Sequence, residues 1–90
     1  MTKELTQVVA QETLTDQYQI LLFNDEDNTF DWVIKSLVEI CDHTHVQAEQ
    51  CAWIVHFNGK YTIKSGEKDD MIHRCIALLD RGLTAEVQAK

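Results

Sequence analysis

The positions of apolar and polar residues along the chain predict six elements of secondary structure. Tyr18–Phe23 is an apolar run of strand length that stops at the polar sequence NDEDN. In the segment that follows, apolar residues recur three and four positions apart, as on one face of a helix. This face consists of Phe30, Val33, Ile34, Leu37, Val38 and Cys41. We therefore expect a buried strand and then an amphipathic helix, capped by Asn28 or Thr29.

Local signals place a second helix and a second strand. Thr44 is followed three residues later by Gln47, which is the pattern of a capping box, and Gly59 is typical of a helix end. Residues 60–64 alternate between polar and apolar, as a half-exposed strand does. Residues 65–66 (Ser-Gly) are predicted to form a turn.

A third helix is predicted over residues 67–81, with acidic side chains in its first turn and Gly82 at its end. Residues 83–88 can form a last short strand. The order β-α-α-β-α-β predicts an α+β domain in which a small antiparallel sheet packs against three helices. We expect the inward face of the third helix to consist of Met71, Ile72, Cys75, Ile76 and Leu79.

The first 17 residues differ from the rest of the chain. They are polar, and their scattered apolar residues keep no period for longer than one turn, which predicts a flexible arm. The chain therefore divides into an arm over residues 1–17 and one domain over residues 18–90, a length that suits a single core. No apolar run approaches the roughly 20 residues of a membrane span, and the first ten residues do not match a signal peptide.

The charge and the cysteines narrow the class of protein. Fifteen acidic against eight basic residues give a net charge of -7, which argues against unspecific binding of nucleic acid and favours cationic partners. The three cysteines have no C-x-x-C spacing and cannot all pair within one chain, so we expect a reduced, cytoplasmic protein. His43 and His45 look like surface residues, and no second ligand pair at zinc spacing accompanies them. We expect no metal and no cofactor.

The most distinctive segment is the acidic turn at residues 24–31 (NDEDNTFD), which holds four carboxylates and no basic residue. It lacks the spacing of an EF-hand, and a solvated turn with helix caps would account for it. Its position favours a second interpretation. Asn24 ends a buried strand, and the acids that follow adjoin Phe30 and Val33 on the helix, so polar acceptors would rim an apolar surface. His56, taken alone, is more often a partner of the helix dipole or a core histidine than a functional group.

Such a site would suit a ligand that is cationic at one point and apolar at the next. An amine with an apolar side chain fits this description, and so does the N-terminus of a peptide. Two other functions stay open at this point. One is a small hydrolase that uses Asp25, Glu26 and His56 as acid–base groups, and the other is an interaction module whose acidic turn is merely solvated. Trp32 and Trp53 lie at the margins of their helical faces, so periodicity does not decide between an edge of the core and a partner contact.

Two segments together resemble the ClpS family, the bacterial adaptors that carry N-degron proteins to the Clp protease. They are residues 18–33 (YQILLFNDEDNTFDWV) and residues 47–60 (QAEQCAWIVHFNGK), and the resemblance extends from Tyr18 to the end of the chain. It implies an adaptor without catalysis of its own, which binds substrates with N-terminal Leu, Phe, Tyr or Trp. It also implies delivery of the substrate to a Clp-family AAA+ unfoldase that is ClpA- or ClpC-like. The arm would contact this unfoldase, and the folded body would bind to the N-terminal domain of the unfoldase.

The resemblance also implies roles for individual residues. Asn24, Glu26 and His56 would bind the α-amino group of the N-terminal residue, and Asp25 would hold the peptide backbone near the mouth of the pocket. The pocket for the N-terminal side chain would be lined by Leu22, Asn28, Phe30, Val33, Ala52, Val55 and Leu83.

The chain departs from the family pattern in four places. Glu26 replaces the usual Asp, Asn28-Thr29 replaces Thr-Pro, Ala52 replaces a Met of the pocket wall, and the arm is short. Because Ala52 removes bulk from the wall, we expect a wider pocket that also accepts N-terminal Ile and Val, unless Phe30 or Trp53 fills the space.

Overall fold

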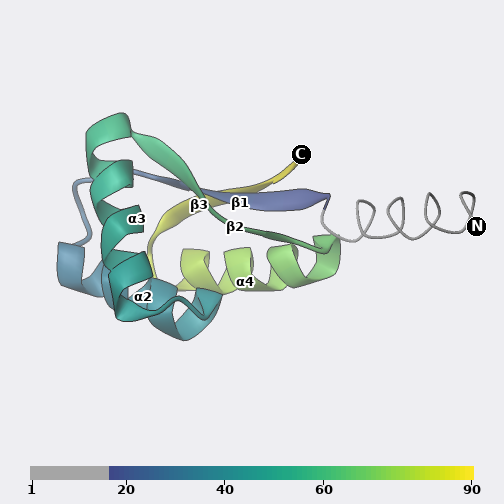
Figure 1. Cartoon of the computed structure of the whole chain (residues 1–90), viewed down its shortest axis with the longest axis horizontal. Helices are drawn as coiled ribbons and strands as arrows, with labels where there is room; N and C mark the ends of the chain where they lie inside the picture. The colour runs from purple at the N-terminus through teal and green to yellow at the C-terminus, as the bar shows by residue number, and fades with distance from the viewer. Residues whose placement is uncertain (1–16) are drawn as a thin grey trace, which may run out of the picture.

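The structure is a computed structural model, and it describes residues 17–90. In this part of the chain, helices and strands follow the predicted order β-α-α-β-α-β, so the predicted α+β class is confirmed (Figure 1). The predicted arm falls almost wholly on residues 1–16, which lie outside the described residues. The elements are β1 (Tyr18–Phe23), α2 (Phe30–Cys41), α3 (His45–Asn58), β2 (Lys60–Gly66), α4 (Lys68–Asp80) and β3 (Thr84–Ala89).

The three strands form an antiparallel sheet in the order β2-β1-β3. Because the apolar strand β1 lies in the centre, both of its edges are paired, Phe23 with Lys60 on one side and with Thr84 on the other. The turn predicted at Ser65 and Gly66 is wrong. These residues extend β2 and pair with Gln19 and Tyr18, since β1 offers backbone partners along its whole length.

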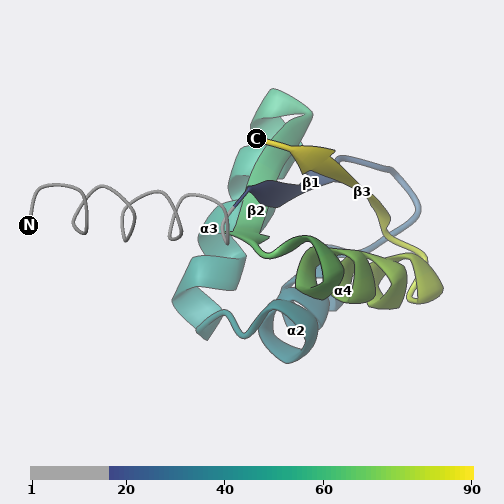
Figure 2. The same ribbon diagram turned by 90° about the vertical axis from the view of Figure 1, so that its right-hand side faces the viewer.

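The helices cover the sheet from one side. Helices α2 and α4 lie below the sheet in Figure 1, and α3 stands beside it, next to β2; the view in Figure 2 shows the same layers from the end. None of the helices that the structure describes is long and apolar enough to cross a membrane. The largest side chains buried between sheet and helices are Ile20, Leu22, Leu37, Met71 and Leu78.

The helix ends follow the predicted caps. Of the two candidates before α2 it is Thr29 that caps the helix, because its hydroxyl oxygen accepts from the Trp32 backbone N–H at 3.1 Å. Before α3, the side chains of Thr44 and Gln47 form the predicted capping box. Helix α3 ends at Gly59 in the left-handed conformation, with φ of 88°.

The predicted inward face of α4 is partly wrong. Ile76 and Leu79 are half exposed, at 50% and 49%, and the buried residues of this helix are Met71, Cys75 and Leu78. Positions 71, 75 and 78 have the same helical spacing as 72, 76 and 79, so two apolar stripes lie side by side on α4. The sheet covers only the first of them.

Candidate functional site

A cavity of about 300 Å³ lies at the end of the sheet where β1 stops. Its wall is built from the last residue of β1, the loop of residues 24–29, the start of α2 and the second half of α3. The lining residues are Phe23, Asn24, Asp25, Glu26, Asn28, Phe30, Val33, Ala52, Val55 and His56. Two segments that are separate in the sequence, residues 23–33 and residues 52–56, therefore meet at this cavity.

The lining has two chemically different parts. Phe30, Val33, Ala52 and Val55 form an apolar wall. Asn24, Glu26 and His56 are exposed and carry polar atoms that can accept hydrogen bonds. The lining includes two carboxylates and no lysine or arginine. Such a cavity is suited to a ligand with a positive group and an apolar group next to each other.

Backbone contacts bring the loop to the end of α3. The Asn24 N–H donates to the Gly59 carbonyl oxygen at 2.8 Å, and the Gly59 N–H donates to the Val55 carbonyl oxygen at 2.8 Å. Asn24 is therefore held beside the last turn of α3, which is the turn that carries His56.

The loop itself is organised by Asp25. One carboxylate oxygen of Asp25 accepts from the backbone N–H groups of Asp27 and Asn28, at 3.0 Å each. The Asn28 side-chain amide donates to both carboxylate oxygens, also at 3.0 Å. These bonds are of the Asx-turn type, in which a short acidic side chain holds the next residues of a turn. Asp25 thus fixes the shape of the loop.

Two further hydrogen bonds attach the loop and the start of α2 to the turn between α4 and β3. The Asn28 side-chain amide donates to the Gly82 carbonyl oxygen at 2.9 Å, and the Trp32 indole N–H donates to the Arg81 carbonyl oxygen at 2.9 Å. Trp32 is half-buried and therefore covers an edge of the core. One side of the cavity is thereby fixed to the body of the domain.

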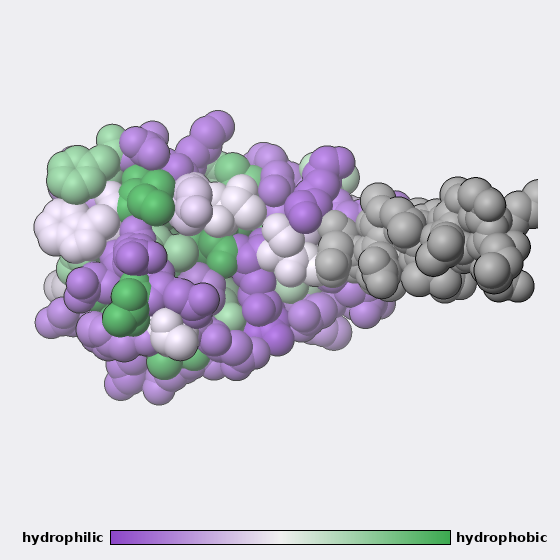
Figure 3. Space-filling view, in the orientation of Figure 1, coloured by the Kyte–Doolittle hydropathy of each residue, from purple (hydrophilic) through white to green (hydrophobic). Residues whose placement is uncertain are grey.

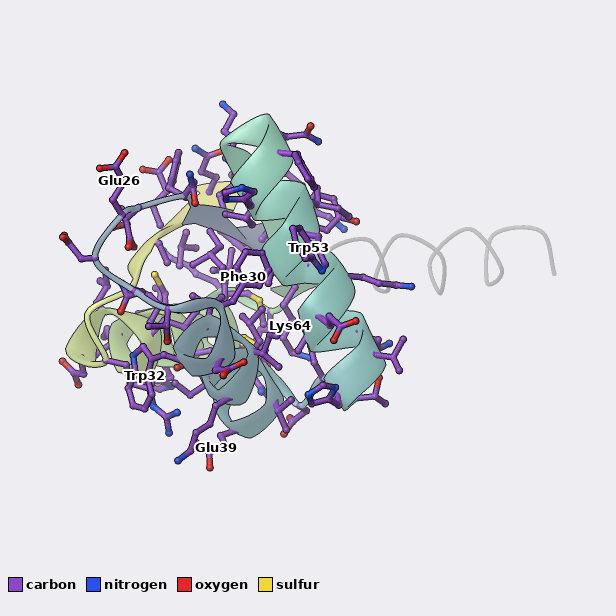
Figure 4. All side chains as sticks on the ribbon, turned by 90° about the vertical axis from the view of Figure 1, so that its left-hand side faces the viewer. Glu26, Phe30, Trp32, Glu39, Trp53 and Lys64 are labelled. Atoms are coloured by element: carbon purple, nitrogen blue, oxygen red, sulfur yellow. The ribbon has the colours of Figure 1, made fainter. Side chains whose placement is uncertain are left out.

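The other side is an aromatic contact between α2 and α3. The Phe30 ring lies 4.5 Å from the Trp53 ring, centroid to centroid, and 5.7 Å from the His56 ring, edge on. Figure 4 shows Phe30 and Trp53 facing each other where the two helices approach, and Glu26 at the outer edge of the loop. The Phe30 ring thus packs against the Trp53 ring.

The family described as ATP-dependent Clp protease adaptor protein ClpS matches residues 13–86. This chain belongs to the ClpS family. Among solved structures it is similar to that of Agrobacterium tumefaciens ClpS2 bound to L-phenylalaninamide, with a TM-score of 0.80 and 16% sequence identity over 84% of this chain and 99% of that one. No curated protein sequence matches significantly. At this identity the structural similarity shows that the fold is shared.

The structure brings together all but two of the residues that the ClpS resemblance singled out. Leu22 and Leu83 do not line the cavity, and both are buried in the core, at 2% and 3% exposure. Successive side chains of a strand point to opposite faces, and in β1 the position of Leu22 faces the core. Phe23, which sequence reasoning missed, lines the cavity instead, and its place as the last residue before the loop was the available signal.

One further prediction concerns a histidine outside the cavity. His43 was predicted to be a surface residue, but it is half-buried, and its Nε2 lies 2.8 Å from the Ile63 carbonyl oxygen. It therefore connects the end of α2 to β2. Within residues 17–90, no three His, Cys, Asp or Glu side chains come together in a way that could hold a metal ion.

Proposed function

We propose that this member of the ClpS family is an N-degron adaptor. It binds the N-terminal residue of a protein substrate, with its free α-amine and bulky apolar side chain, and delivers the substrate to a Clp-family AAA+ unfoldase, ClpA- or ClpC-like. The observation that carries the proposal is the cavity, because its acceptor-bearing mouth adjoins an apolar wall. Asn24, Glu26 and His56 bind the amine, and Phe30, Val33, Ala52 and Val55 surround the side chain.

The chemistry of an α-ammonium group matches the mouth of the cavity. The group carries three N–H donors and one positive charge. Asn24 offers a neutral acceptor, Glu26 a charged one, and neutral His56 accepts through one ring nitrogen. A well-made hydrogen bond to a charged group contributes about 1.5–3 kcal/mol. Acetylation of the amine removes the charge and two of the donors, so we expect an acetylated peptide not to bind.

The apolar wall matches the side chain. Burial of a Leu or Phe side chain contributes about 1.5–3 kcal/mol. The similar ClpS2 structure supports this part of the proposal, because L-phenylalaninamide combines a free α-amine with a phenyl ring. After the costs of association and ordering, we expect sub-micromolar to micromolar affinity.

The adaptor proposal includes the absence of catalysis and a cytoplasmic location. Asp25, which a hydrolase would need as an acid–base group, is engaged by the loop through the Asn28 amide and two backbone N–H groups. The three cysteines are free and buried, which supports a reducing compartment. Incubation of the full chain with a peptide that begins with Phe tests the first part. Release of free Phe would contradict it.

Fluorescence anisotropy tests the binding site directly. A labelled peptide with N-terminal Phe is titrated with the full chain, and the same peptide is titrated after N-acetylation. We expect binding of the free peptide only. His56→Ala and Asn24→Ala should each weaken binding at least tenfold, whereas His73→Ala, which removes an exposed histidine from α4, should leave the affinity unchanged. Equal binding by all variants would favour a different interaction module with a solvated acidic turn.

A further inference from the structure

Two aromatic side chains stand exposed near the end of α3. Trp53 is 47% exposed and Phe57 is 74% exposed, and their rings are stacked, 5.5 Å apart with an interplanar angle of 16°. They are four residues apart and therefore lie on the same side of the helix. Figure 3 shows pale green and near-white side chains gathered over the end of α3, at the left of the molecule. The solvent side of a helix is normally polar, so this aromatic pair is unusual for a free surface.

The aromatic pair is continuous with the wall of the cavity. The Trp53 ring lies 4.5 Å from the Phe30 ring, and the Phe57 ring lies 5.2 Å from the His56 ring. Phe30 and His56 both line the cavity. An occupant of the cavity that extends toward α3 therefore passes from His56 directly onto the aromatic pair.

The two sides of the mouth differ in charge. The loop side carries Asp25, Glu26 and Asp27, whereas the α3 side continues with Trp53 and Phe57. An apolar side chain that leaves the cavity is buried more favourably on the α3 side, because contact with the loop side would require the exposed Glu26 carboxylate to lose water.

We propose that Trp53 and Phe57 form a second subsite, which binds an aromatic side chain at the second or third position of the same N-terminal peptide. This inference rests on the proposed function of the cavity. An extended peptide advances about 3.3–3.6 Å per residue, so the second and third residues lie about 3–7 Å beyond the first. The rings of Trp53 and Phe57 are 6.1 and 5.2 Å from His56, which is within this reach. The substrate class is thus a bulky N-terminal residue followed closely by an aromatic one.

The subsite is tested with three labelled peptides that share one polar tail and begin with Phe-Gly-Gly, Phe-Tyr-Gly or Phe-Gly-Tyr. Aromatic pairs contribute modestly, so we expect the full chain to bind one of the Tyr peptides about three- to tenfold more tightly than Phe-Gly-Gly. Phe57→Ala should remove most of this preference. Trp53→Leu, which keeps an apolar side chain against Phe30, should also reduce the preference for the Tyr peptide. Leu79→Ala, at a similarly exposed apolar position on α4, should leave the affinities for all three peptides unchanged.

The outcomes separate the subsite from the cavity. Binding of Phe-Gly-Gly without any preference for Tyr at either position would overturn the subsite and leave the proposed function standing. The subsite would also be overturned if Phe57→Ala weakened binding of all three peptides by the same factor, because the effect would then act through His56. If no peptide with a free amine bound, the proposed function and the subsite would both be wrong.

Discussion

The Asn28 side chain joins two segments that are distant in the sequence. Its amide donates to the Asp25 carboxylate and to the carbonyl oxygen of Gly82, which lies 54 positions after Asn28. Asn28→Ala removes these bonds and leaves the Asp25 carboxylate with fewer donors. We expect the free energy of unfolding to fall by about 1–2 kcal/mol in urea denaturation, and peptide affinity to fall with it. Asn58→Ala, at the exposed end of α3, is the control. Equal stability of the two variants would show that Asn28 does not hold the loop.

Ala52 contributes only a methyl group to the wall where the family usually has Met. We expect wild-type protein to bind N-terminal Ile and Val within about tenfold of Leu, since one or two methyl groups are worth only about 1–3 kcal/mol. Ala52→Met should weaken Ile and Val more than Phe or Leu in the same anisotropy assay. If wild-type protein already rejects Ile as strongly as Ala52→Met does, Phe30, which lies against Trp53, fills the space.

Single residues were predictable where their signal is local. The sequence places Asn24 and Asp25 in the loop after the first strand and His56 near the end of the second helix. It does not show that the Asn24 N–H donates to the Gly59 carbonyl oxygen. The hydrogen bond from Asn28 to Gly82 could not be predicted from the sequence either, because it depends on the position of the turn after α4 in the folded domain. The roles of the cavity residues in binding stay predictions.

At the scale of elements, α3 depends on its N-terminal cap, because it carries both Ala52 and His56. Thr44→Ala removes the side-chain acceptor for the Gln47 N–H, so we expect the free energy of unfolding to fall by about 1 kcal/mol. Thr44→Ser keeps the hydroxyl and should restore most of the loss. Urea denaturation of the three proteins measures both effects. Equal stability of Thr44→Ala and Thr44→Ser would mean that the cap is not used in solution.

The ends of α2 and α3 were predictable from their capping residues, whereas features that depend on tertiary packing were not. Thr29, Thr44 and Gly59 act on backbone groups within a few residues, so their sequence pattern was sufficient. The inward stripe of α4 depends on how this helix is rotated against the sheet, and Ile76 has the same spacing as Cys75. Likewise, only pairing with β1 draws Ser65 into β2.

At the scale of the whole molecule, burial of the cysteines predicts a stability limit at high pH. Burial raises the pKa of the Cys41 thiol from 9.0 to about 11. In the unfolded chain the thiol ionises near pH 9, whereas the folded protein keeps its proton until about pH 11. Ionisation of Cys41 therefore does not affect the free energy of unfolding below pH 9. Between pH 9 and 11 it lowers the free energy of unfolding, by at most about 2–3 kcal/mol.

Urea denaturation between pH 8 and 10.5 measures this loss, with Cys41→Ala as the comparison. Cys51 and Cys75 are shifted in the same direction by burial and remain in both proteins. The free energy of unfolding should decline less steeply for Cys41→Ala. Parallel declines would show that Cys41 does not contribute.

The two ends of the described chain lie next to each other. The Lys90 N–H donates to the Gln17 carbonyl oxygen at 2.6 Å, and Tyr18 pairs with Ala89. The cavity lies at the opposite end of β1, six residues or about 20 Å away. Linking residue 90 to residue 17 would therefore close the chain with a short bridge and permit circular permutation. We therefore expect a surface tether attached at Lys90 to leave the mouth of the cavity facing the solution.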